Sequence, residues 1–281
     1  EASEAEAAAP PVETAEVVDN SVLLAEILEA QDPDNKARFG DRNPAETIEF
    51  FGLEPGMTIA EALPGGGWYS KILLPYLGDE GKLIGIDYSI DMWSKFGAFA
   101  DAAFLESKET WAETWVGDAE GWRAGTEADL AAFAFGSRDP ALDGTVDAVL
   151  MVRAMHHLNR FNSDEQDYMA EALADVHALL KPGGTLGIVQ HRAPEGNDDA
   201  WANGDNGYVK QSAVIEWVEA AGFELVDQSE VNANAKDQPT TDDFVWRLPP
   251  TLGTSNEDPE LRAEMEAIGE TDRMTLKFRK I

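Results

Sequence analysis

Two acidic residues flank a glycine-rich stretch with the spacing of a nucleoside-binding site. Glu61 ends a short apolar run, Gly65, Gly66 and Gly67 follow, and Asp87 closes a second apolar run 20 positions after Gly67. Glycines let the backbone approach a ligand closely, and a helix that follows them offers free N–H groups to anionic atoms. An acid at the end of the second strand can hold the two hydroxyls of a ribose. The pattern predicts a nucleoside-cofactor site.

A second group of reactive side chains follows a later apolar run, Val146–Val152. Arg153 and His156 come directly after it, and His191 and Arg192 end the next expected strand. Imidazole titrates near neutral pH and guanidinium holds carboxylates, so this group could supply a general base and an anion clamp. A metal site built from His156, His191 and a carboxylate is an alternative, although no close pair of histidines supports it.

The elements that must position these residues alternate between strands and helices. The sequence predicts helices at 22–30, 44–51, 68–77, 164–180 and 211–221, and strands at 57–62, 82–86, 146–152, 185–190, 223–231 and 274–279. The third strand has two candidates, Thr114–Val116 and Ala131–Phe135.

This order predicts an α/β fold, namely a Rossmann-like, doubly wound and mostly parallel sheet with an antiparallel pair of strands at one edge near the C-terminus. We expect a disordered leader at residues 1–19, a helical extension at 20–45 and one domain over 46–281. The leader begins with Glu1 and is rich in Ala, Glu and Pro. It resembles the start of a mature chain after signal-peptide removal, which predicts a periplasmic or secreted protein.

Charge limits the partners. The 281 residues include 54 acids and 21 Lys or Arg, a formal net charge of −33, and no cysteine. Such a surface repels nucleic acid, whose binding requires clustered Lys and Arg. The absence of cysteine excludes disulfides and thiolate sites, and no apolar run approaches the roughly 20 residues of a membrane span. The acids favour solubility in a saline habitat, with self-association or divalent cation binding as the sharper alternative.

Several landmarks give the chain a resemblance to a known family. They are PAET at Pro44–Thr47, PGMT at Pro55–Thr58, PGGGWY at Pro64–Tyr69, RAMHHL at Arg153–Leu158, LKPGG at Leu180–Gly184, QHRA at Gln190–Ala193, DDFVWRLPP at Asp242–Pro250 and TDRMTLKFRK at Thr271–Lys280. Over residues 36–281 the chain is similar to class I S-adenosylmethionine-dependent methyltransferases. More narrowly, it resembles a group of exported bacterial proteins known as predicted methyltransferases.

The resemblance implies S-adenosylmethionine as cofactor. Glu61 would lie near its ammonium group, Trp68 would cover it, and Asp118 would meet the adenine if the third strand precedes that residue. It also implies that Tyr208, Lys210 and Arg247 line the acceptor side of the site. The sequence departs from the class pattern at Leu63, where the first of three glycines usually stands.

The leading hypothesis is methyl transfer to a small acceptor, with His156 as base and Arg153 or Arg192 as clamp. One rival is a nicotinamide-dependent oxidoreductase, because Gly65, Gly67 and Asp87 nearly satisfy the dinucleotide pattern. Another is an exported binding or structural protein on the same fold, since the cofactor is made in the cytoplasm and fold does not imply function.

Overall fold

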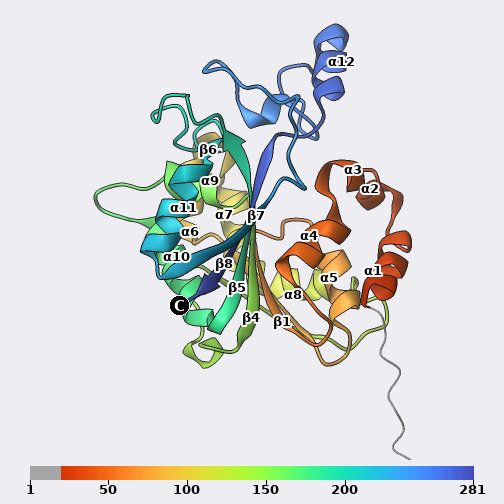
Figure 1. Ribbon diagram of the computed structural model, residues 1–281. Helices are drawn as coiled ribbons and strands as arrows, with labels where there is room; N and C mark the ends of the chain where they lie inside the picture. Colours follow the sequence, from red (N-terminus) through yellow and green to blue (C-terminus); the bar gives the residue numbers. More distant parts are fainter. Residues whose placement is uncertain (1–19) are drawn as a thin grey trace, which may run out of the picture.

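A single twisted sheet runs through the centre of the molecule (Figure 1). The computed structural model describes residues 20–281, so the expected leader lies outside the described part. The strand order of the sheet is β3-β2-β1-β4-β5-β8-β7, with the short β6 paired to β5. The strands are β1 (Thr58–Ala62), β2 (Lys82–Asp87), β3 (Asp129–Ala134), β4 (Val146–Val152), β5 (Leu180–Ala193), β6 (Val209–Lys210), β7 (Phe223–Ser229) and β8 (Arg273–Lys280).

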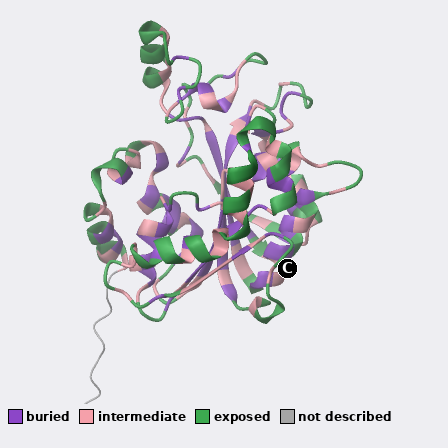
Figure 2. Cartoon of the chain, turned by 180° about the vertical axis from the view of Figure 1, so that it is seen from behind, coloured by how far each residue is buried: buried purple, intermediate pink, exposed green. Residues whose placement is uncertain are grey.

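The pairing confirms the expected fold class. β1 to β5 are parallel neighbours, whereas β8 is antiparallel to both β5 and β7. The central strands β1 and β4 are almost entirely buried, as continuous apolar runs predict for strands covered on both faces. Figure 2 shows these buried strands between helices whose outer faces are exposed.

Helices cover both faces of the sheet. The helices are α1 (Asn20–Glu29), α2 (Pro33–Lys36), α3 (Phe39–Arg42), α4 (Pro44–Phe51), α5 (Ser70–Leu77), α6 (Ile90–Trp93), α7 (Ala102–Glu109), α8 (Trp111–Glu120), α9 (Met155–Arg160), α10 (Tyr168–Leu179), α11 (Gln211–Ala220) and α12 (Pro259–Ile268), with 3₁₀ turns η1 (Ser94–Phe99), η2 (Pro140–Leu142) and η3 (Val245–Arg247). One hydrophobic cluster joins α1, α4, α5 and α8 to the sheet, and another joins α6, α9, α10 and α11 to it. Within residues 20–281, none of the helices has the length and apolar character that a membrane crossing requires.

The third strand corresponds to the second of the two sequence candidates. β3 pairs in parallel with β2, whereas Thr114–Val116 lies inside α8. The β-branched Thr114 and Val116 suggested a strand, but tertiary packing decides: Trp115 is buried against Gly85 of β2, where a Cβ would lie 2.8 Å from its ring. Asp118 is therefore an exposed residue of α8 and does not follow a strand.

The helix expected from Asp164 begins later than predicted. Ser163 Oγ does accept the backbone N–H of Gln166, but it closes only a turn. The side chain of Asp167 accepts the N–H of Ala170 and caps α10, which starts at Tyr168. The capping-box spacing at Ser163 therefore marks a local turn, and the helix cap is Asp167.

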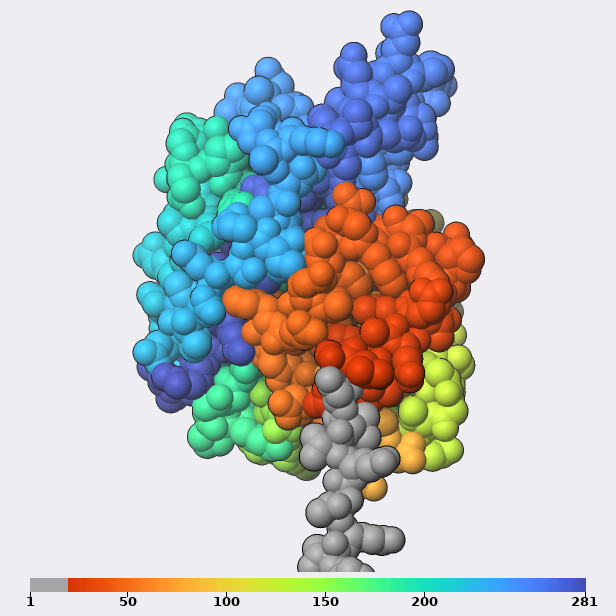
Figure 3. Space-filling model, turned by 45° about the vertical axis from the view of Figure 1, so that its right-hand side comes forward, coloured from red at the N-terminus to blue at the C-terminus, as the bar shows by residue number. Residues whose placement is uncertain are grey.

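The long connection between β7 and β8 lies above the carboxyl ends of the parallel strands and carries η3 and α12 (Figure 1). It contacts the N-terminal helices: the Asn43 side chain donates to the Val231 carbonyl at 2.7 Å. Figure 3 shows the two segments side by side. Residues far apart in the sequence therefore meet beside the strand ends.

Candidate functional site

The turn after β1 has the backbone conformation expected of a ligand-approaching loop. Leu63, Gly65 and Gly67 have φ values of 58°, 56° and 77°. Leu63 thus adopts the left-handed conformation that glycine usually occupies, which costs a side chain about 1 kcal/mol or more. A Cβ on Gly66 would meet no atom within 4 Å, whereas one on Gly67 would lie 2.5 Å from Trp122. The open part of the loop is therefore Gly65 and Gly66, and Gly67 serves packing.

Glu61 is the penultimate residue of β1, just before this turn, and is buried. Its Oε2 accepts a hydrogen bond of 2.6 Å from Ser70, the first residue of α5. Burial raises the pKa of Glu61 to about 7, although the Ser70 hydroxyl opposes the shift. A carboxyl in this environment would bind a cation such as an ammonium group favourably, because the cation would restore its ionised form.

Asp87 ends β2 as predicted, and both of its oxygens have partners. Oδ1 accepts the N–H of Tyr88 at 2.8 Å, and Oδ2 pairs with Lys108 of α7 at 2.7 Å. Burial raises the pKa of Asp87, and Lys108 opposes the rise. Lys108 also lies over the ring of Trp93 at 4.2 Å. Asp87, the acid expected to hold a ribose, is thus occupied by an ion pair with Lys108, which packs on the ring of Trp93.

A cavity of about 220 Å³ lies at the carboxyl ends of the strands and is lined by Arg153, His156 and His191 of the second group of reactive residues. Its walls come from the carboxyl ends of four strands and from the segment before β8. The lining residues are Leu63, Tyr88, Trp93, Val152, Arg153, His156, His157, His191 and Trp246. The chain order reverses between β1 and β4, and open α/β sheets bind ligands at such a switch point.

His156 and His191 meet in this cavity, with ring centroids 5.5 Å apart, as their positions on neighbouring strand ends predict. Gln190 orients His156: its Oε1 accepts the N–H of Met155 at 3.2 Å, and its Nε2 and Oε1 lie 3.2 Å and 3.4 Å from His156 Nδ1. Burial lowers the pKa of His156 to about 3. His156 is therefore a neutral hydrogen-bonding group in this cavity and a poor general base.

The other histidines of the cavity are also held neutral. Burial and the neighbouring His156 lower the pKa of His191 well below its ordinary value, and His191 Nδ1 lies 2.6 Å from Thr271 Oγ1. Burial and His156 lower the pKa of His157 to about 2. The His157 ring stacks on Trp246 at 6.0 Å.

Arg153 lies at the cavity wall, whereas Arg192 does not. Arg192 pairs with Asp272 at 2.8 Å and with Glu230 at 2.7 Å, and these hydrogen bonds raise its pKa. Successive strand residues point to opposite faces, so His191 faces the cavity and Arg192 faces away from it. The expectation that both residues join one group is wrong for Arg192.

Four other expected positions also lie outside the cavity lining, as do Glu61, the glycines of the turn and Asp87, which are close in sequence to the lining residues Leu63 and Tyr88. Trp68 packs against the N-terminal helices, with its indole N–H 3.3 Å from the Asn35 carbonyl. Lys210 pairs with the exposed Asp199. Tyr208 and Arg247 both bond the buried Asp237, at 2.8 Å each. Of these four residues, only Tyr208 and Arg247 contact the C-terminal segment, which they hold through Asp237.

Sequence reasoning missed several residues at this edge. Lys108 gave no signal, since α7 lies in the stretch where no element could be assigned. Arg42 and Arg273 are almost completely buried, which is unusual for arginine. Arg273 directly precedes the expected last strand, but the sequence analysis gave it no role. Trp246 lies in the quoted motif at 242–250 but had no assigned role.

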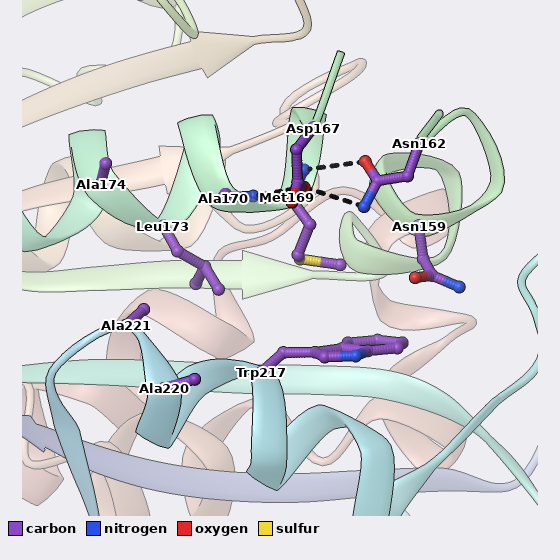
Figure 4. A pocket seen from close by; sticks show the side chains of 10 residues that line it. All are labelled: Asn159, Asn162, Asp167, Met169, Ala170, Leu173, Ala174, Trp217, Ala220 and Ala221. Atoms are coloured by element: carbon purple, nitrogen blue, oxygen red, sulfur yellow. Dashed lines mark hydrogen bonds between the residues drawn. The ribbon is translucent and has the colours of Figure 1, made fainter. Parts of the chain in front are cut away.

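A larger hollow lies elsewhere, between α10 and α11 (Figure 4). Met169, Leu173 and Trp217 form its apolar floor, and the amide of Asn162 bonds Asp167 at 2.9 Å. Its polar groups satisfy one another, and no strand ends there. We therefore place the candidate site in the smaller cavity at the strand ends.

Among residues 20–281, no three side chains of His, Asp or Glu converge in a way that could hold a metal ion. The alternative metal site at His156 and His191 thus has no third ligand in the described part of the chain.

The comparisons with known proteins concern the fold. No family model matches the sequence, and no curated protein matches it. Among solved structures, a chain of the complex between the Haloferax volcanii Trm112 methyltransferase activator and a candidate methyltransferase is 16% identical, with a TM-score of 0.51 over 91% of this chain and 96% of that chain.

Two further solved structures are similar. The cyclase SpnF is 19% identical, with a TM-score of 0.50 over 85% of this chain and 80% of that chain. A SAM-dependent methyltransferase from Aquifex aeolicus is 16% identical, with a TM-score of 0.49 over 92% of this chain and 98% of that chain. At these identities the likeness shows the fold alone: the chain has the Rossmann-like fold of methyltransferases.

Proposed function

We propose that the protein binds S-adenosylmethionine at the carboxyl ends of β1 and β2 and transfers its methyl group to a small acceptor in the adjoining cavity. The observation that carries the proposal is the placement of Glu61, the open glycines and Asp87 at the carboxyl ends of β1 and β2, where Leu63 and Tyr88 line a cavity at the switch point of the sheet. When bound, the cofactor supplies an already activated methyl group.

The chemistry of the residues fits this cofactor. Glu61 would accept from the ammonium group, Gly65 and Gly66 would let the backbone approach the amino-acid end, and Asp87 would accept from the ribose hydroxyls. The cavity of about 220 Å³ is smaller than the roughly 300–1,000 Å³ of most ligand sites. Binding therefore requires the Asp87–Lys108 pair to open, which also moves the aromatic cover near Trp93.

The remaining residues orient the acceptor and exclude water. Arg153 would hold an anionic part of the acceptor, and the neutral ring of His156 would form a hydrogen bond with a neighbouring polar atom of the acceptor. The aromatic rings of Tyr88 and Trp246 form part of the cavity wall. This division of work needs alignment more than proton removal, since transfer depends on holding the acceptor atom in line with the methyl group.

The second candidate function is ligand binding without catalysis. The closed Asp87–Lys108 pair favours it, because the acid that a cofactor would need is already satisfied. The similarity to the cyclase SpnF, at 19% identity, is also consistent with a fold that serves more than one activity.

Calorimetric titration tests the proposal. S-adenosylmethionine and S-adenosylhomocysteine should bind the wild-type protein with micromolar affinity, and Asp87→Ala should weaken both by at least about tenfold, equivalent to about 1.4 kcal/mol. NADH serves as the control nucleotide for the oxidoreductase alternative. Tight binding of NADH alone, or no binding of either adenosyl compound at low and high salt, would remove the methyl-transfer reading.

A further inference from the structure

Four arginines from distant parts of the chain converge beside the candidate cavity. Arg38 and Arg42 come from the N-terminal helices, Arg153 follows β4, and Arg273 begins β8. They surround a single buried carboxylate, Glu270. We call these five residues the arginine cluster. Arg273 is the direct cross-strand partner of His191, so its side chain shares the sheet face of that cavity residue.

Glu270 serves three of the four arginines at once. Its oxygens lie 2.6 Å from Arg38 Nε, 3.3 Å from Arg42 Nε and 3.1 Å from Arg273 Nη1. Arg273 Nη2 also donates to the carbonyl of Asp41 at 2.6 Å. The single carboxylate of Glu270 therefore compensates only part of the positive charge of these arginines.

Several guanidinium donors in the cluster remain unused. Arg42 Nη2, Arg153 Nε and Arg273 Nε are buried and have no hydrogen-bond partner in the described part of the chain. The side chains of Arg42 and Arg273 are each only 3% exposed. A buried donor without a partner is costly, so a native fold rarely keeps three of them together without a reason.

The charge balance points the same way. Four guanidinium groups and one carboxylate leave an excess of three positive charges, and the excess is still two when nearby Asp41 is counted. The whole chain carries −33. Burial and repulsion from Arg153 lower the pKa of Arg42 to about 9, and burial and repulsion from Arg273 lower that of Arg153 to about 10. These shifts express the same missing negative charge.

We propose that Arg42, Arg153 and Arg273 form a binding site for a compact anionic group, a carboxylate or a small oxyanion, carried by the ligand of the adjoining cavity. Guanidinium groups bind such anions through paired N–H donors, and here three unused donors are already in place. Arg153 connects the cluster to the cavity, since it lines the cavity wall.

Two sources could supply this anionic group: the acid group of the acceptor, or the carboxylate at the amino-acid end of the cofactor. The assignment to either source rests on the proposed function, whereas the site itself does not. An acidic acceptor would gain specificity from the cluster, because the negative surface elsewhere repels it.

The test measures stabilisation by simple anions. Thermal unfolding is followed with increasing sodium sulfate or sodium acetate, against sodium chloride at equal ionic strength. The melting temperature of the wild-type protein should rise with saturation, and Arg153→Gln and Arg273→Gln should each weaken the apparent affinity at least tenfold. Arg262→Gln, which removes a partly exposed arginine of α12, is the matched control and should respond like wild type.

Arg153→Gln separates a ligand role from a structural one. Arg153 makes no ion pair with a side chain of residues 20–281, and its buried Nε has no hydrogen-bond partner there. The variant should therefore fold at least as stably as wild type in the absence of anions, whereas a structural role predicts a loss of stability. An equal anion response in wild type and both variants would overturn the site, as would no saturable response in wild type.

Competition in the wild-type protein identifies the source and needs no variant. If the cofactor carboxylate occupies the cluster, S-adenosylhomocysteine competes with sulfate, whereas methylthioadenosine, which lacks the amino-acid end, does not. If sulfate and S-adenosylhomocysteine bind together, the site holds the acid group of the acceptor. If the cofactor binds but simple anions give no response, the proposed function stands and the anion site is ruled out. If simple anions bind but the cofactor does not, the anion site stands and the proposed function is ruled out.

Discussion

Glu61 makes the stability of the protein depend on pH in a defined direction. Its folded pKa of about 7 exceeds the ordinary 4.5, so the folded state binds more protons than the unfolded state between these values. The free energy of unfolding therefore falls as pH rises through this window, by up to about 3 kcal/mol from this group alone. Glu61→Gln keeps the acceptor for Ser70 and should remove that part of the decline.

Chemical denaturation of wild type and Glu61→Gln at pH 5 and pH 8 measures this effect. The variant should gain stability relative to wild type at pH 8 more than at pH 5. Glu113→Gln, an exposed change on α8, is the control and should follow wild type. A constant difference between Glu61→Gln and wild type at both pH values would show that the carboxyl is ionised throughout.

Lys108 limits access to Asp87. Because their ion pair is largely buried, the open form that could bind a ribose is a minor state, and its population reduces the apparent affinity. Lys108→Met should raise the affinity for S-adenosylhomocysteine by roughly tenfold. It should also destabilise the free protein, because Asp87 loses its partner.

Calorimetry on Lys108→Met measures this effect, with Lys95→Met as control for the loss of an exposed lysine in the same segment. Weaker binding by Lys108→Met and unchanged binding by Lys95→Met would mean that Lys108 contacts the cofactor instead of competing with it.

At the scale of elements, the turn between β1 and α5 contains two glycines with different roles. Gly67 has a positive φ and packs on Trp122, whereas Gly66 faces open space. Gly67→Ala forces the Trp122 ring to move and should cost about 1 to 3 kcal/mol. Gly66→Ala should change stability little, and it tests ligand approach separately. Equal losses in thermal or chemical unfolding would contradict this assignment.

The sequence predicted the elements well where local and tertiary signals agreed. The apolar runs of β1, β2 and β4 and the two acids that end the first two strands all lie where expected. The prediction for Asp118 was wrong because the choice between the two candidates for the third strand depended on how Trp115 packs against Gly85, which is a tertiary contact. The prediction for Arg192 was wrong because the face to which a strand side chain points alternates with each residue, so that Arg192 points to the face opposite to that of His191.

The arginine cluster could not be predicted from the sequence for a related reason. Its members come from residues 38–42, 153 and 270–273, and only the folding of the C-terminal segment onto the N-terminal helices brings them together. No spacing rule connects such positions. The resemblance to a methyltransferase family predicted at which end of the sheet the candidate site lies, and only the contacts of the folded chain reveal the arginine cluster beside it.

At the scale of the whole molecule, a buried network holds the C-terminal segment over the strand ends. Asp237 accepts from Tyr208 and Arg247 and also from the N–H of Asp272 at 2.9 Å, just before β8. Asp237→Asn removes a fully buried charge and leaves Arg247 with only Asp243. It should cost about 3 kcal/mol.

Chemical unfolding checks the role of this network. Asp243→Asn, in which the lost carboxylate is partly exposed, is the matched control and should cost less than about 1 kcal/mol. A loss for Asp237→Asn no larger than that of Asp243→Asn would show that the C-terminal segment is held by other contacts.

Amide hydrogen exchange with and without S-adenosylhomocysteine would report both whether the cofactor product binds and where it binds. We expect slower exchange at residues 61–70, at the turn after β1, and at 87–108, where the Asp87–Lys108 pair must open and close over the ligand. Unchanged exchange in both segments, or protection confined to the hollow between α10 and α11, would contradict a cofactor site at the ends of β1 and β2.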